Sequence, residues 1–100
     1  MLAKLAPREV RAALKKLPGW KKVRGEEAIA RTFVFADFRR AFAFITAAAF
    51  AADKMDHHPD WSNSYKTVAV KLTSHDAGGV TERDLALAKA MDEAAATFLR

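Results

Sequence analysis

The chain has 100 residues, a formal net charge of +5 at pH 7 and a hydrophobic share of 51%. This length predicts one domain spanning residues 1–100, with a core large enough to fold without metal or disulfide staples. The absence of cysteine excludes disulfides, thiol chemistry and cysteine-based zinc sites. The longest apolar run, residues 41–52, is shorter than the ~20 residues that span a bilayer. The first residues carry no secretory signal pattern, so we expect a cytoplasmic protein without a membrane partner.

Charge is unevenly distributed along the chain. Residues 1–40 carry eleven Lys or Arg and four Asp or Glu (net +7), whereas residues 41–100 carry six and eight (net −2). A basic half can mark a nucleic-acid surface, but these cations are scattered and form no compact arginine run. A solvated basic face is the favoured interpretation, and we do not expect nucleic acid as a partner.

The first third of the chain predicts a helix followed by a hairpin. The helix starts near Pro7, stops at Pro18 and carries apolar residues at helical spacing, namely Val10, Leu14 and Leu17. Residues 20–24 and 28–35 read as two strands, and a hairpin is their simplest connection.

The middle of the chain predicts a long helix that Asp37 caps. It should end near residues 53–55, because Pro59 forces an extended residue before it. The expected buried stripe leaves out Phe44 and Phe50 and contains Phe38, Ala41, Phe42, Ile45, Ala49 and Ala52.

The last third predicts a strand pair and a final helix. Residues 61–74 alternate like a strand but exceed the usual length, so a break near Tyr65 is expected. Thr81 and Asp84 have the spacing of a capping box for a helix reaching about Leu99. Its expected buried residues are Leu85, Ala88, Met91, Ala95 and Phe98 or Leu99. The order of helix, hairpin, helix, strand pair and helix predicts an α+β sandwich of two layers.

All three histidines lie between residues 53 and 84, which points to a site there. His57 and His58 precede Pro59, and His75 follows a strand, where loops assemble sites. Imidazole titrates near pH 6.5 and can donate or accept a proton at cellular pH. A metal site is the competing interpretation, but adjacent histidines are awkward ligands of one ion and no His-Glu-x-x-His pattern is present. Histidines that serve only the surface or the core are the third possibility.

Two further residues allow two interpretations each. Asp84 could simply cap its helix, or its carboxylate could also orient a histidine or bind a substrate. Trp61 could stack on a flat ligand or fill space against the sheet. The sequence alone does not separate these alternatives.

The spacing of Asp53, His57–His58–Pro59, Tyr65, His75 and Asp84 resembles that of the pterin-4a-carbinolamine dehydratases. The resemblance covers essentially the whole chain, including the runs Leu17-Pro18-Gly19-Trp20, Arg31-Thr32-Phe33-Val34-Phe35, Asp37-Phe38-Arg39-Arg40-Ala41-Phe42, Pro59-Asp60-Trp61 and Gly78-Gly79-Val80-Thr81-Glu82-Arg83-Asp84. It implies a four-stranded antiparallel sheet with three helices packed on one face. It also implies a dehydratase that converts 4a-hydroxytetrahydropterin to quinonoid dihydropterin and so recycles the cofactor of aromatic amino acid hydroxylases.

The resemblance also suggests roles for individual residues. His57 and His75 are expected to act as acid and base on the two sides of C4a–N5, while His58 mainly holds the pterin. The remaining expected substrate contacts are Asp56, Trp61, Thr73, Ser74, Asp76 and Asp84. No metal or other cofactor is expected, since the pterin is the substrate.

The expected partners follow from the same resemblance. They are the small-molecule pterin, further copies of the chain in a homodimer or homotetramer, and an aromatic amino acid hydroxylase in the same pathway. Unpaired edges of a small isolated sheet also favour self-association. The alternative function is a non-catalytic binding module, or a dimerisation cofactor of a transcription factor, built on the same fold.

Overall fold

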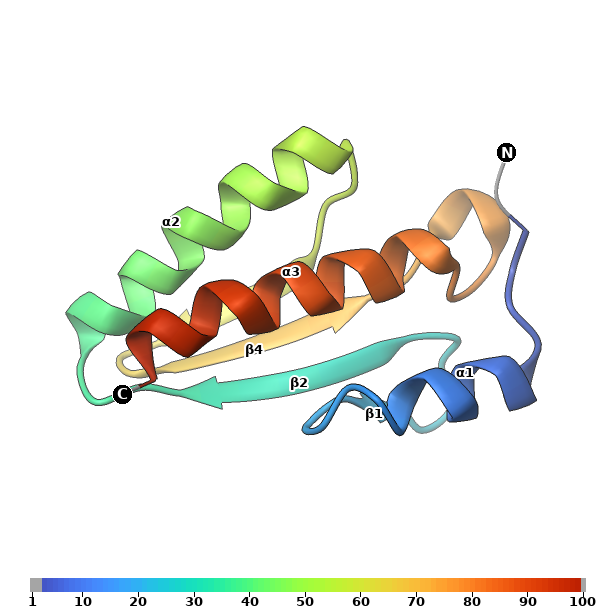
Figure 1. Ribbon diagram of the computed structural model, residues 1–100, viewed down its shortest axis with the longest axis horizontal. Coiled ribbons are helices and arrows are strands. Elements are labelled where there is room, and N and C mark those ends of the chain that lie inside the picture. The colour runs from blue at the N-terminus through green and yellow to red at the C-terminus, as the bar shows by residue number, and fades with distance from the viewer. Residues whose placement is uncertain (1–2, 100) are drawn as a thin grey trace.

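A computed structural model describes residues 3–99 as four strands, three α-helices and one short 3₁₀ helix (Figure 1). In chain order they are α1 (Pro7–Leu14), β1 (Lys21–Lys22), β2 (Ile29–Val34), α2 (Phe38–Met55), β3 (Asp60–Ser64), β4 (Thr67–Leu72), the 3₁₀ helix η1 (His75–Ala77) and α3 (Glu82–Phe98). The strands form one antiparallel sheet in the order β1-β2-β4-β3. This is the predicted α+β sandwich, with the helices on one face of a four-stranded sheet.

The core lies between the sheet and the long helices α2 and α3, which run side by side over one face (Figure 1). In the two central strands, Phe33 of β2 pairs with Val68 of β4, and these residues are 1% and 0% exposed. Phe44 of α2 packs on Phe33, with the ring centroids 4.7 Å apart. Removing this apolar surface from water is the main stabilising contribution to the layered arrangement.

The predicted buried stripe of α2 was partly wrong. Phe44 was placed outside the stripe, yet it is fully buried, whereas Phe42 is 54% exposed. The buried residues of α2 are Ala41, Phe44, Ala48 and Ala52. The small side chains of the alanines on this face allow the helix to come close to α3 and the sheet. Phe44 is the one large side chain among the buried residues of α2. The sequence of α2 is apolar on several sides, so helical periodicity could not identify the face that the sheet selects.

The predicted boundaries differ at the ends of several elements. The first helix was expected to reach Pro18 but ends at Leu14. The first strand was expected over residues 20–24 but is reduced to Lys21–Lys22, since Trp20 turns into the core with 3% of its surface exposed. On α3, Leu87 is buried in place of the expected Leu85, which is only half-buried. The break near Tyr65 is confirmed, because Tyr65 has a φ of 51° in the tight turn between β3 and β4.

No helix within residues 3–99 combines the length and apolarity needed to cross a membrane.

Candidate active site

One pocket gathers all three histidines of the chain. It has a volume of about 330 Å³ and lies where three segments meet: the connection from α2 to β3, the chain leaving β4, and the first turn of α3. Its lining residues are Asp56, His57, His58, Thr73, His75, Asp76 and Arg83. Six of these were predicted as site residues, and the structure brings them together.

The end of α2 directs the paired histidines into this pocket. Asp56 adopts a left-handed conformation with a φ of 51° and ends the helix. The N–H of His57 then donates to the carbonyl of Ala52 at 3.1 Å, which reverses the chain direction. This is the helix-ending geometry that favours Gly or Asn, so Asp at this position adopts a less populated conformation.

The loop carrying His75 is closed by backbone hydrogen bonds. Ser74 and Gly79 pair in both directions, with N···O distances of 2.9 and 3.2 Å. Gly78 ends η1 with a φ of 77°, a conformation that glycine adopts without strain. The closed loop carries His75 and Asp76, which line the pocket together with Thr73.

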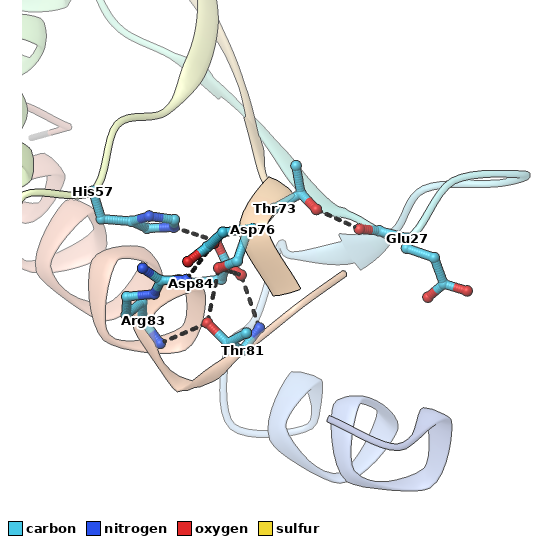
Figure 2. A network of polar contacts seen from close by, with 8 residues as sticks. Glu27, His57, Thr73, Asp76, Thr81, Arg83 and Asp84 are labelled. Carbon is cyan, nitrogen blue, oxygen red and sulfur yellow. Dashed lines mark hydrogen bonds and ion pairs between the residues drawn. The ribbon is translucent and has the colours of Figure 1, made fainter. Parts of the chain in front are cut away.

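A buried hydrogen-bond network anchors His57 (Figure 2). Asp84 has 0% of its surface exposed, and its carboxylate accepts from His57 Nε2 at 2.5 Å, from the Ser74 hydroxyl at 2.8 Å and from the Thr81 N–H at 2.9 Å. Since an ionised carboxylate only accepts hydrogen bonds, we assign the proton of this contact to Nε2, which leaves Nδ1 of His57 for proton exchange. Both interpretations of Asp84 therefore hold in part: it completes the capping box and it orients a histidine.

The opposite side of the pocket is open to solvent. His58 and His75 are both exposed, while His57 is 8% exposed. Arg83 donates to Asp76 Oδ1 at 2.6 Å. This hydrogen bond, supported by the positive charge of Arg83, lowers the pKa of Asp76 below its ordinary value against an opposing effect of desolvation. Asp76 is therefore ionised at neutral pH and offsets the charge of the guanidinium.

Four predicted substrate contacts have other positions or partners. Ser74 and Asp84 lie behind the pocket, where they hold His57 and do not line its surface. Trp61 is not brought to this pocket; it lies on β3 and lines a separate hollow with residues such as Thr32 and Lys71. There it packs against the core, as the second interpretation of this residue held. The Thr73 hydroxyl donates to the carbonyl of Glu27 at 2.7 Å, so this side chain also ties two segments together.

Arg83 is the pocket residue that the sequence reasoning missed. It stands at the second position of α3, where a cation is unfavourable beside the positive end of the helix dipole. That placement was the available signal, because a basic residue in a first turn suggests a requirement other than helix stability. Its Nε is buried and has no hydrogen-bond partner within residues 3–99.

Fold and pocket together define a small α+β protein whose site offers imidazoles for proton transfer, one of them fixed by a buried carboxylate. The sequence profile of the family described as pterin 4 alpha carbinolamine dehydratase matches residues 3–94. The chain belongs to this family.

Individual relatives agree with this assignment. A protein of Rhodopseudomonas palustris (strain BisB18), provisionally named pterin-4-alpha-carbinolamine dehydratase, is 57% identical over 96% of this chain and 95% of its own length. A relative of the same provisional name from Afipia carboxidovorans is 60% identical over 88% of each chain.

Solved structures show the same fold. A transcriptional coactivator/pterin dehydratase from Brucella melitensis matches with a TM-score of 0.91 and 48% identity, covering 92% of this chain and 98% of its own. A pterin dehydratase-like protein described as a RuBisCO assembly factor of the α-carboxysome matches with a TM-score of 0.67 over 77% of this chain and 89% of its own. At 22% identity, the second similarity shows the fold alone.

Proposed function

We propose that this protein removes water from 4a-hydroxytetrahydropterin to give quinonoid dihydropterin. The observation that carries the proposal is the convergence of three imidazoles in one pocket, with His57 anchored by the buried carboxylate of Asp84. Membership of the pterin carbinolamine dehydratase family supports the substrate class. The physiological role we propose is the recycling of pterin cofactor for an aromatic amino acid hydroxylase.

The reaction requires two proton transfers. The hydroxyl on C4a accepts a proton and leaves as water, N5 gives up its proton, and a double bond forms between C4a and N5. We assign these transfers to His57, through its free Nδ1, and to His75 on the open side of the pocket. Each positioned acid or base typically contributes a factor of ~10²–10⁴ in rate.

The other pocket residues suit an uncharged ring with polar edges. His58 is assigned to holding the pterin, and the carboxylates of Asp56 and Asp76 can accept hydrogen bonds from its ring N–H and amino groups. The Asp76–Arg83 pair brings no net charge to the pocket, which suits a neutral substrate. Neither a metal ion nor another cofactor has a role in this proposal.

A dehydratase assay tests the proposal. The 4a-carbinolamine is generated with a phenylalanine hydroxylase, and its absorbance decay is followed with wild type, with the His57→Ala/His75→Ala double variant and without this protein. Faster decay with wild type alone is the expected result. Equal decay in all three reactions would contradict it and would favour the alternative, a binding module of the same fold without catalysis.

We also propose that the protein is a homodimer or homotetramer. Three phenylalanines of α2 support this, since Phe38, Phe42 and Phe50 are 47%, 54% and 74% exposed. The rings of Phe38 and Phe42 are in contact, with centroids 5.8 Å apart, and contiguous exposed apolar patches are typical of interaction surfaces. Size-exclusion chromatography with light scattering should give a multiple of the 11.0 kDa chain mass, and Phe42→Glu/Phe50→Glu should lower it. A wild-type monomer would refute the oligomer.

A further inference from the structure

A second hollow adjoins the histidine pocket. It has a volume of about 320 Å³ and is lined by Glu26, Glu27, Ala28, Thr73, His75 and Gly78. Thr73 and His75 line both cavities, so these two residues form the boundary between them. A ligand that reaches past His75 would therefore leave the pocket and enter this hollow.

The hollow is built from two segments that are held together. The Thr73 hydroxyl donates to the carbonyl of Glu27 at 2.7 Å and fixes the loop before β2 beside the end of β4 (Figure 2). Gly78 contributes no side chain, and a Cβ placed there would find nothing within 4 Å. The space beside His75 is therefore open and has a defined acidic wall.

The two glutamates of this wall differ in their electrostatic state. Glu26 is paired with Lys71, with Nζ and Oε1 2.8 Å apart. The carboxylate of Glu27 has no ion pair or hydrogen bond within residues 3–99, while the side chains of Lys4 and Glu27 both lie beside Gly79. Glu27 is therefore the carboxylate of the hollow without an ion-pair partner within residues 3–99, and Glu26 is the paired one.

The position of the variable substituent on a pterin ring connects the carboxylate of Glu27 to the choice of substrate. C6, which carries the variable substituent of natural pterins, is bonded directly to N5. If His75 exchanges the N5 proton, the C6 substituent lies next to His75, which also lines the second hollow. A carboxylate accepts hydrogen bonds from hydroxyl groups and repels an anion.

We propose that the second hollow receives the C6 substituent and that Glu27 selects pterins with neutral, hydroxylated substituents over pterins with anionic ones. This inference rests on the proposed dehydratase function and specifies its substrate class. Glu27 acts as a specificity-determining residue and takes no part in the proton transfers.

A matched pair of ligands tests the inference. The fluorescence of 6-hydroxymethylpterin and of pterin-6-carboxylate, which differ in the charge at C6, gives their dissociation constants. Wild type should prefer the neutral ligand by about fivefold, the size expected for two unit charges ~4 Å apart in water. Glu27→Gln should reduce this preference to about twofold or less, mainly through tighter binding of the carboxylate. Glu93→Gln, the same change on α3 outside the hollow, should keep the wild-type preference.

The outcomes separate this inference from the proposed function. Equal affinities in wild type, or a preference that Glu27→Gln leaves unchanged, would overturn the inference. If the same preparation accelerates decay of the carbinolamine, the proposed function survives that result. A wild type that neither accelerates the decay nor binds either pterin would refute both. Glu27 is exposed, so circular dichroism should show both variants folded like wild type.

Discussion

The two sides of the histidine pocket differ in how their side chains are held. On one side, His57 is almost completely buried and bonded to Asp84, whose carboxylate also satisfies Ser74 and Thr81. On the other side, His58 and His75 are exposed. The buried side connects catalysis to the stability of the fold, because its residues hold α3 against the loop after β4. The open side can change without disturbing the core, and it leaves space for a ligand.

Removing Asp84 should have the largest effect on stability. Asp84→Ala leaves His57, Ser74 and the Thr81 N–H without their acceptor, and loss of one member of a buried pair costs about 3–5 kcal/mol. Urea unfolding should therefore show a midpoint well below that of wild type. A decrease of less than about 1 kcal/mol in the free energy of unfolding would mean that the network contributes little to folding. The two sides of the pocket would then not differ in their contribution to stability.

Asp84→Asn is the matched variant for activity. It keeps the shape of the side chain but cannot accept hydrogen bonds at both terminal atoms, so His57 loses its fixed orientation while the helix is disturbed less. We expect kcat in the dehydratase assay to fall by ~10²-fold or more, with pterin affinity changed much less. Unchanged kcat would show that Asp84 is only a helix cap.

The open side should give the reverse pattern. His75→Ala removes an exposed imidazole, and surface substitutions usually alter stability by less than about 0.5 kcal/mol. In contrast, kcat should fall by ~10²–10⁴-fold while pterin binding is largely kept. Loss of binding with kcat retained would assign His75 to substrate binding, and a large loss of stability would contradict the contrast between the two sides.

The Asp76–Arg83 pair should show the smallest effect, and its pH dependence has a defined sign. Because the hydrogen bond from Arg83 lowers the pKa of Asp76 from its ordinary value of 3.8, the pair stabilises the fold above that value. This contribution is lost as pH falls through the lowered pKa of the folded state. The free energies of unfolding of wild type and Asp76→Asn should differ slightly at pH 7 and converge in acid. A difference that grows in acid would contradict the assigned direction.

Much of the site could be predicted because its residues are close in sequence and chemically distinctive. His57, His58 and His75 were identified from residue type and position, and Thr81 and Asp84 from the spacing of a capping box. The partner of Asp84 could not be predicted in this way, since His57 is 27 positions away and their contact depends on how α2 and α3 cross the sheet. Trp61 stands two residues after Pro59, yet its strand carries it out of the pocket.

The sequence by itself determined the order of elements, the two-layer class and the identity of the histidines, because periodicity, turn residues and caps act over a few neighbouring positions. Only the tertiary structure decided which face of α2 is buried. Only it decided that Asp84 is fully buried against His57, and that Thr73 and His75 divide the pocket from a second hollow. The physical reason is that burial and hydrogen-bond partners depend on contacts between segments far apart in the chain, which local spacing does not specify.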